Sequence, residues 1–176
     1  MKPAVFFDRD GIVNRSPGPG YVERWEDFHL LPEFVEALRI VTARGYEPVI
    51  VTNQSGVGRG LMTPEALEQI HGNLRAELAR HALALRDLLV CTNPDNADPR
   101  RKPNPGMLLE AAREHGLDLA RSWMIGDSES DIEAGRRAGC HTLRVAPPAV
   151  ATAADERVPD MPALVRWLQE HLAPAA

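Results

Sequence analysis

The sequence has few cysteines, no basic excess and no long apolar run, and each scarcity argues against a class of protein. Only two of the 176 residues are cysteine, Cys91 and Cys140, so a reduced cytoplasmic setting fits better than a disulfide framework. The formal charge of -5 argues against nucleic acid as the main partner, because phosphate backbones normally call for a basic surface. No apolar stretch approaches the roughly 20 residues that span a bilayer, and the N-terminus does not resemble a signal peptide.

The apolar content indicates a folded chain with one core. Apolar residues make up 44% of the sequence, which is too many for a disordered chain. We find no internal repeat and no long linker, so this length predicts a single domain over residues 1–176. We expect a monomer or a weak oligomer.

Short apolar runs alternate with segments of helical periodicity. Strands are predicted at residues 4–7, 48–52, 88–91, 123–125 and 141–145. Helices are predicted at 33–44, from Pro64 onward, between Pro105 and Gly116, between the fourth strand and Gly139, and around 161–168. Residues 149–154 are expected to form a loop. This alternation predicts an α/β, Rossmann-like fold: a parallel central sheet with helices on both faces.

Polar clusters follow four of the predicted strands. They are Asp8 and Asp10, then Thr52 to Ser55, then Arg101 and Lys102, and finally Asp127. The carboxyl ends of parallel strands share one edge of the sheet, where such folds bind ligands. Each cluster alone also fits a turn, a helix cap or a solvated loop. Together, in order and on one edge, they predict a functional site.

These residue types match the demands of phosphoryl transfer. Asp8 and Asp10 are two close anions that need a cation or a shared proton, and Asp127 adds a third carboxylate. Oxygen ligands of this kind suit Mg²⁺. Lys102 and Thr52 would supply a positive charge and a hydroxyl for the phosphoryl oxygens. An aspartate can act as the nucleophile, and a second acid can move the protons.

The same residues resemble the four motifs of the haloacid dehalogenase-like (HAD) phosphatases over most of the chain. The matching segments are Phe7-Asp8-Arg9-Asp10-Gly11, Val51-Thr52-Asn53, Lys102-Pro103 and Gly126-Asp127-Ser128-Glu129-Ser130-Asp131. The resemblance implies Asp8 as the nucleophile and Asp10 as the general acid and base. It also implies Mg²⁺ held by the carboxylates of Asp8 and Asp127 and the main-chain carbonyl of Asp10. Thr52 and Lys102 would stabilise the phosphoryl group, and Asp131 would orient Lys102 or a metal-bound water.

Longer segments resemble one branch of this superfamily, which holds D-glycero-D-manno-heptose 1,7-bisphosphate phosphatases and histidinol-phosphate phosphatases. These segments are residues 52–60, residues 101–107 and Gly20-Tyr21-Val22. The last one resembles a short substrate-facing flap. By this resemblance the substrate contacts would come from Gly20, Tyr21, Thr52, Asn53, Gln54, Ser55, Arg101 and Lys102. Arg101 would suit a second phosphate.

Three departures from the branch affect the parts that select substrate. The branch usually carries a zinc loop of three cysteines and one histidine, but only Cys91 remains here, so no structural zinc is expected. Ser128 stands where heptose enzymes often have lysine. The flap contains Pro17 and Pro19 and is expected to be stiff. The intervals between motifs leave no room for a separate cap domain, so loops should set specificity.

The sequence therefore predicts a magnesium-dependent phosphatase of small phosphorylated metabolites, with no nucleic-acid or membrane partner. The preferred substrate is a sugar bisphosphate, D-glycero-D-manno-heptose 1,7-bisphosphate, cleaved at its 7-phosphate. Histidinol phosphate or another small sugar phosphate remains an alternative. A phosphoacceptor signalling domain is a different class, but its acceptor aspartate follows the middle strand, where this chain has Asn53. The six histidines are scattered and are interpreted as surface or packing residues.

Overall fold

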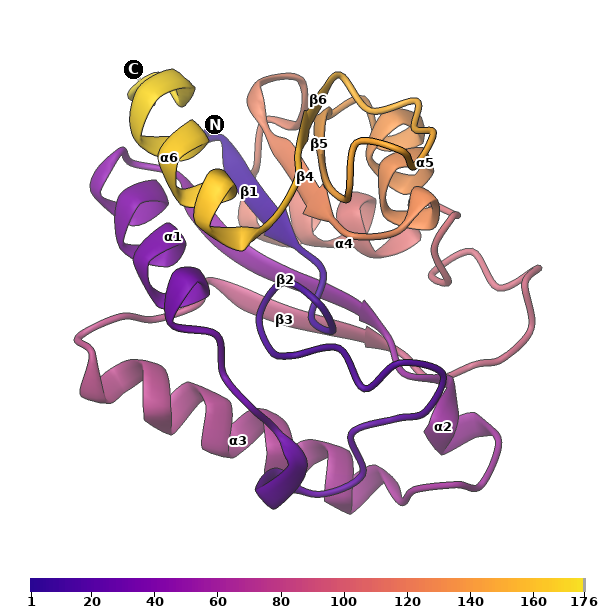
Figure 1. Ribbon diagram of the computed structural model, residues 1–176. Helices are drawn as coiled ribbons and strands as arrows, with labels where there is room; N and C mark the ends of the chain where they lie inside the picture. Colours follow the sequence, from indigo (N-terminus) through magenta and orange to yellow (C-terminus); the bar gives the residue numbers. More distant parts are fainter. Residues whose placement is uncertain (176) are drawn as a thin grey trace.

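A six-stranded parallel sheet forms the centre of the molecule in the computed structural model, which describes residues 1–175 (Figure 1). The strand order is β3-β2-β1-β4-β5-β6, and every neighbouring pair is parallel. The strands are β1 (Ala4–Phe7), β2 (Glu47–Asn53), β3 (Asp87–Cys91), β4 (Trp123–Gly126), β5 (His141–Val145) and β6 (Glu156–Val158). This architecture confirms the predicted α/β fold with its parallel sheet.

Helices cover both faces of the sheet, as predicted (Figure 1). One face packs against α1 (Pro32–Ala43), α3 (Pro64–Arg80) and α6 (Met161–His171). The other face packs against α4 (Gly106–His115) and α5 (Glu129–Ala138). The remaining short elements are α2 (Ser55–Gly58) and the 3-10 turns η1 (Trp25–Asp27) and η2 (Leu119–Arg121).

Strand β1 shows why its sequence is apolar throughout. Its side chains alternate between the two faces, as a strand requires. Val5 and Phe7 enter the core beneath α1, α3 and α6, whereas Ala4 and Phe6 enter the core beneath α4 and α5. All four side chains are fully buried, so a strand in the middle of a parallel sheet has no polar face.

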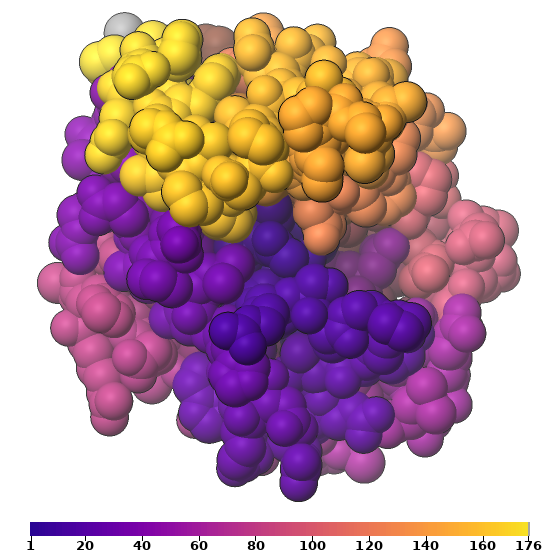
Figure 2. All heavy atoms as spheres, in the orientation of Figure 1, coloured from indigo at the N-terminus to yellow at the C-terminus, as the bar shows by residue number. Residues whose placement is uncertain are grey.

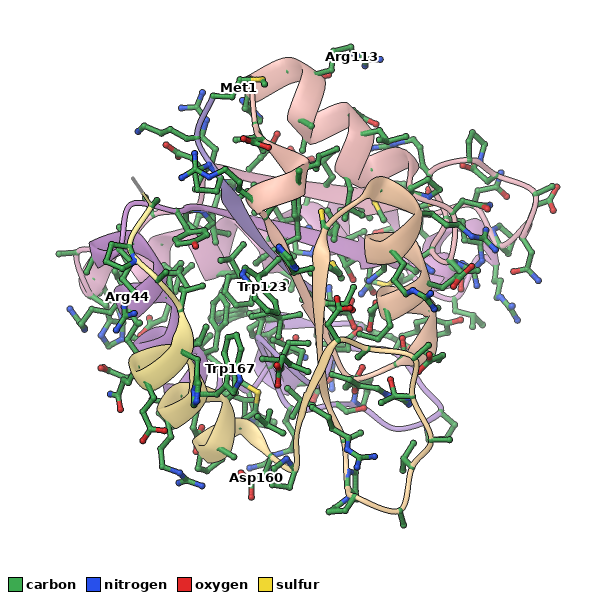
Figure 3. The ribbon with its side chains drawn as sticks, turned by 90° about the horizontal axis from the view of Figure 1, so that it is seen from above. Met1, Arg44, Arg113, Trp123, Asp160 and Trp167 are labelled. Atoms are coloured by element: carbon green, nitrogen blue, oxygen red, sulfur yellow. The ribbon has the colours of Figure 1, made fainter. Side chains whose placement is uncertain are left out.

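Aromatic contacts attach the last helix to the sheet. Trp167 of α6 meets Trp123 of β4 edge to face, with ring centroids 4.9 Å apart (Figure 3). Asp160 accepts a hydrogen bond from the Ala163 N–H and caps the start of α6. Thr63 caps α3 in the same way through Ala66, in agreement with the helix start read from Thr63-Pro64.

Besides the 3-10 turns η1 and η2, one strand and one helix were absent from the sequence-based prediction. Strand β6 pairs with β5 over only three residues, Glu156 to Val158, which is too short to show a period. Helix α2 is a single turn directly after β2. The segment 149–154 is free of helix and strand, as expected.

The carboxyl ends of the strands are covered by loops. Within residues 1–175 no separate module lies over them, which agrees with the predicted lack of a cap. Figure 2 shows the indigo and violet N-terminal residues at the surface, below the orange and yellow C-terminal residues. In the same part of the chain, no helix is both long and apolar enough to cross a membrane.

Candidate active site

A cavity of about 240 Å³ lies at the carboxyl ends of the central strands. It sits where the strand order reverses between β1 and β4, the usual ligand position in doubly wound folds. Its lining residues are Asp8, Asp10, Ser16, Pro17, Gly18, Gly20, Tyr21, Asn53, Lys102, Asp127, Ser128, Ser130 and Asp131. The structure thus brings eight of the sequence-predicted site residues to one cavity: Asp8, Asp10, Gly20, Tyr21, Asn53, Lys102, Asp127 and Asp131.

The Lys102 ammonium group is the positive centre of the site. Its Nζ donates to Asp8 Oδ1 at 2.7 Å and to Asp131 Oδ1 at 2.6 Å. A third hydrogen bond, of 2.8 Å, goes to the main-chain oxygen of Val51 on β2. Burial alone would lower the pKa of Lys102, but the charges of Asp131 and Asp8 outweigh burial and raise it. Lys102 is therefore a permanent cation held between two carboxylates.

Asp8 and Asp127 carry more negative charge than Lys102 neutralises. Burial and the neighbouring Asp131 charge raise the pKa of Asp8 to about 7 and that of Asp127 to about 6. The carboxylate oxygens of Asp8, Asp127 and Asp131 lie within 4.8 Å of one another. A divalent cation among these oxygens would relieve the repulsion, and an all-oxygen donor set suits Mg²⁺. The residues present therefore fit such an ion.

The two oxygens of Asp131 are both engaged by protein groups. Oδ1 accepts from Lys102, whereas Oδ2 accepts from the main-chain N–H and the hydroxyl of Ser128 at 3.1 and 2.8 Å. The bond from the Ser128 N–H is one half of a capping box at the start of α5, whose other half runs from the Asp131 N–H to the Ser128 side chain. Asp131 approaches so closely because residue 126 is glycine: a Cβ there would lie 2.2 Å from Asp131 Oδ2.

Asp10 lies at the cavity in a different electrostatic setting from Asp8. Its Oδ1 accepts from Asn14 at 2.9 Å and from Arg9 at 3.0 Å, and its Oδ2 accepts from Gln54 at 2.9 Å. Burial would raise the pKa of Asp10, but the Arg9 charge and these hydrogen bonds outweigh burial and lower it. In the metal-free site the pKa values of the two aspartates of the first motif are therefore displaced in opposite directions.

The second motif contributes mostly buried support. Thr52 and Gln54 are almost fully buried, and Gln54 Nε2 donates to both Asp10 and Thr52 Oγ1. The Ser55 and Tyr21 hydroxyls lie 3.0 Å apart, which ties α2 to the flap, defined as residues 15–22. Thr52, Gln54 and Ser55 are not among the cavity-lining residues. Their predicted contacts with substrate stay predictions.

Asn53 joins the second motif to the third. Its Nδ2 donates to the main-chain oxygen of Lys102 at 2.9 Å, and its Oδ1 accepts from the Lys102 N–H at 3.1 Å. This two-way clamp holds the backbone of residue 102 against the end of β2. The Asn53 clamp and the bond to the Val51 oxygen both come from β2, so this strand holds the Lys102 side chain in place beside Asp8.

Arg101 is not brought to the cavity. Its guanidinium group donates to Asn96 Oδ1 at 3.1 Å and to the main-chain oxygen of Asn93 at 3.2 Å. Both partners belong to the loop of residues 92–104, where the sequence resemblance leads one to expect zinc ligands in related enzymes. The side chain thus holds this loop together in the structure, and its role in phosphate recognition stays a prediction.

Sequence reasoning missed three residues around Asp10. Arg9 and Asn14 are fully buried and hydrogen-bonded to its carboxylate, and His71 of α3 lies 3.1 Å from Arg9 NH1. Arg9 is within the first motif and Asn14 four residues beyond Asp10, so adjacency offered a weak signal for both. Nothing in the local sequence connects His71 with them, because the contact depends on how α3 packs.

Comparisons with known proteins agree with this geometry. Residues 99–166 match a family model described as HAD-hydrolase-like. The chain is 36% identical to a D-glycero-D-manno-heptose-1,7-bisphosphate 7-phosphatase of Thermosynechococcus vestitus, over 98% of each chain. It is 40% identical to a D-glycero-beta-D-manno-heptose-1,7-bisphosphate 7-phosphatase of Helicobacter pylori, over 77% of this chain and 78% of the relative. The solved D,D-heptose 1,7-bisphosphate phosphatase of B. bronchiseptica, complexed with magnesium and phosphate, superposes with a TM-score of 0.83 at 30% identity and covers 97% and 99% of the two chains.

Proposed function

The chain belongs to the D-glycero-D-manno-heptose-1,7-bisphosphate 7-phosphatase family of HAD-like hydrolases, and from this premise we propose that it hydrolyses the 7-phosphate of such a heptose bisphosphate with Mg²⁺. The phosphatase class follows from family membership. The substrate, the ion and the roles of individual residues are our proposal. The observation that carries it is the buried group of Asp8, Lys102 and Asp131 beside Asp127, open to a small cavity.

Asp8, Asp127 and the main-chain oxygen of Asp10 would hold the ion. When bound, Mg²⁺ neutralises phosphoryl oxygens and lowers the repulsion between phosphate and carboxylates. Lys102, which donates to Asp8 at 2.7 Å, would add a second positive charge beside the phosphoryl group. Asp131 keeps Lys102 in place and does not need to contact substrate.

The reaction proceeds in two displacements at phosphorus. In the first, an Asp8 carboxylate oxygen forms a bond to phosphorus while the bond to the sugar oxygen breaks, and Asp10 gives its proton to that leaving oxygen. In the second, Asp10 takes a proton from a water whose oxygen attacks phosphorus. The bond to Asp8 then breaks, and inorganic phosphate leaves.

The open site supports a small substrate held by loops. The lining of the cavity of about 240 Å³ includes Ser128, Ser130 and the flap residues Ser16, Pro17, Gly18, Gly20 and Tyr21. A terminal phosphate can reach Asp8 while the rest of the sugar projects toward the flap. We also retain the expectation of a cytoplasmic enzyme that is a monomer or a weak oligomer.

The test is phosphate release with Mg²⁺ from a panel of esters. The panel contains both anomers of the heptose bisphosphate, histidinol phosphate, fructose 1,6-bisphosphate and simple sugar monophosphates, with Asp8→Asn as the inactive control. We expect one heptose anomer to exceed every other ester in kcat/KM by at least about tenfold, and Asp8→Asn to lose activity by several orders of magnitude. Preference for another ester would overturn the substrate, and an active Asp8→Asn would overturn the mechanism.

A further inference from the structure

Arg9 is the largest fully buried side chain of the molecule, and it lies between the two aspartates of the first motif. A guanidinium group is costly to remove from water unless its donors and its charge are matched. Among hydrophobic neighbours, a chain could satisfy this position more simply with an apolar residue. The contacts of Arg9 show what the buried charge accomplishes.

The guanidinium group of Arg9 grips the Asp10 carboxylate. NH2 donates to both carboxylate oxygens at 3.0 and 3.2 Å, and Nε approaches Oδ1 at 3.3 Å. The group also lies over the ring of Phe28, 5.7 Å from its centroid. A planar fork bonded to both oxygens restricts the rotation of a carboxylate in a way that a single donor does not.

His71 supports Arg9 from the far side. Its Nε2 lies 3.1 Å from Arg9 NH1, and the residue is 9% exposed. Burial and the positive charge of Arg9 lower the pKa of His71 to about 3. The ring is therefore neutral, and Nε2 can accept from NH1, which leaves the proton on Nδ1. In this form His71 adds no charge and limits Arg9 to one orientation.

The other two donors to Asp10 also hold its carboxylate in place. Asn14 and Gln54 both turn their amide N–H groups to the carboxylate. Their amide oxygens, Asn14 Oδ1 and Gln54 Oε1, are the buried side-chain polar atoms in residues 1–175 that lack a hydrogen-bond partner. Unpartnered buried acceptors are uncommon and costly. Asn14 and Gln54 thus donate hydrogen bonds to the Asp10 carboxylate while their own amide oxygens remain without a partner.

We propose that Arg9 is a positioning residue, braced by His71 and Phe28, which holds the Asp10 carboxyl where it exchanges a proton with the leaving sugar oxygen. This rests on the proposed role of Asp10 as general acid and base. In the first displacement the proton passes from Asp10 to the sugar oxygen as its bond to phosphorus breaks. Arg9 takes no part in that transfer and acts only by fixing the donor.

The proposal predicts a dependence on the leaving group. A sugar alkoxide leaves poorly without a proton, so its ester depends on a well-aligned Asp10. Nitrophenolate leaves without a proton, so the kcat/KM of p-nitrophenyl phosphate reports attack by Asp8 alone. Misalignment of Asp10 should slow the first ester and spare the second. General loss of folded enzyme would slow both equally.

The experiment compares His71→Phe with His71→Gln, which keeps an acceptor, and with His81→Gln, an exposed change near the end of the same helix. The substrates are p-nitrophenyl phosphate and the heptose bisphosphate, or fructose 1,6-bisphosphate where that is the faster alkyl ester. We expect His71→Phe to lower kcat/KM for the alkyl ester about tenfold or more, within the usual range of general acid catalysis. Its kcat/KM for p-nitrophenyl phosphate should change less than about threefold. His71→Gln should restore much of the loss, and His81→Gln should match the parent protein.

Arg9→Lys provides a second route, because lysine keeps the charge and loses the fork. Arg9→Lys should also lower kcat/KM for the alkyl ester more than for p-nitrophenyl phosphate. Thermal unfolding of the variant shows what fraction of it is folded under the assay conditions. Equal losses on both esters, or no loss on either, in His71→Phe and Arg9→Lys would overturn the positioning role. Failure of the parent protein to cleave any alkyl ester would instead overturn the proposed function, so the two failures are distinguishable.

Discussion

The charge centre around Lys102 and the loop of residues 92–104 that leads into it are neighbours in the chain, yet opposite kinds of interaction hold them. In the centre, one buried ammonium group bonds two carboxylates at 2.6 and 2.7 Å. In the loop, exposed side chains bond main-chain groups nearby. The stability of the charge centre depends on each of its charged groups, whereas the stability of the loop is shared among many weak contacts.

The loop is built from side-chain turns of Asn and Asp. Asn93 Oδ1 accepts from the Asp95 N–H at 3.0 Å, Asp95 Oδ1 from Ala97 at 2.9 Å, and Asp98 Oδ1 from Arg100 at 2.8 Å. Such local bonds are typical of these residues in turns. They occupy the place where relatives are expected to have zinc ligands, so short-range hydrogen bonds can hold a loop of this kind.

The difference between the two regions teaches where substitutions will be tolerated. Removing one partner from a buried ion pair leaves an uncompensated charge. Removing one exposed hydrogen bond returns its partner to water. Lys102 belongs to the centre by its side chain and to the loop by its backbone, and Asn53 clamps that backbone from β2.

The largest effect is expected from Lys102→Met. The change leaves Asp8 and Asp131 without their shared cation, and we expect about 3–5 kcal/mol of lost stability in metal-free buffer. Activity should fall by at least about a hundredfold, because the phosphoryl oxygens lose a fixed charge. Urea unfolding and kcat/KM for the preferred ester measure the two effects.

Two variants sharpen that comparison. Lys2→Met removes the other lysine of the chain, whose exposed ion pair with Glu47 spans 2.9 Å, and it should cost less than about 1 kcal/mol. Adding Asp131→Asn to Lys102→Met removes one of the stranded charges, so it should recover stability but not activity. If Lys102→Met unfolds at the same urea concentration as Lys2→Met, the buried charges of the centre do not depend on one another for stability.

The second effect concerns pH and magnesium. The pKa values of Asp8 and Asp127 are raised to about 7 and about 6 in the metal-free site, and both carboxylates must lose their protons to bind the ion. Apparent Mg²⁺ affinity should therefore be constant above pH 8 and fall by up to about tenfold between pH 7 and pH 6, then more steeply below. Titration of activity with Mg²⁺ at each pH measures this.

The stability of the metal-free protein should depend on pH through the same two carboxyl groups, but it should fall as pH rises, whereas Mg²⁺ affinity rises. Their folded-state pKa values exceed the ordinary 3.8, so the metal-free protein binds more protons folded than unfolded. It should lose their contribution as pH rises from about 4 through 7, and Mg²⁺ should stabilise it more at pH 8 than at pH 5. Equal shifts of the unfolding temperature by Mg²⁺ at both pH values would contradict this assignment.

The smallest effect is expected in the loop. Asn93→Ala removes the bond to the Asp95 N–H and the 2.9 Å bond from Asn93 Nδ2 to Asp98, and it should cost about 1 kcal/mol or less. The unfolding temperature should fall by no more than about 2–4 °C, with kcat nearly unchanged. Asn93→Ser, which keeps a hydrogen-bond acceptor, should recover part of the lost stability. A loss of stability as large as that of Lys102→Met would show that the loop, like the charge centre, fails when one of its contacts is removed.

Much of the fold could be predicted from local pattern. The five longer strands are apolar runs next to turn residues, and α3 begins where Thr63 and Pro64 indicate. Strand β6 escaped prediction because three residues carry no period, and it exists by pairing with β5. The prediction of the site was more uneven. Asp8, Lys102 and Asp127 meet as the motif order indicates, whereas Arg101 turns into its own loop.

The sequence by itself determined which reactive groups are available to the site: aspartates directly after β1 and β4, and a lysine in the loop after β3, on the carboxyl side of one parallel sheet. Tertiary structure alone decided the environment of each group. Burial and the proximity of Asp131 raise the pKa of Asp8, while Arg9 lowers that of Asp10 two residues away. The contact between Arg9 and His71 likewise depends on how α3 packs over its face of the sheet. Local sequence specifies which groups are present, but desolvation and the coupling of Asp8 to the distant Asp131 and Lys102 arise only when folding brings these segments together.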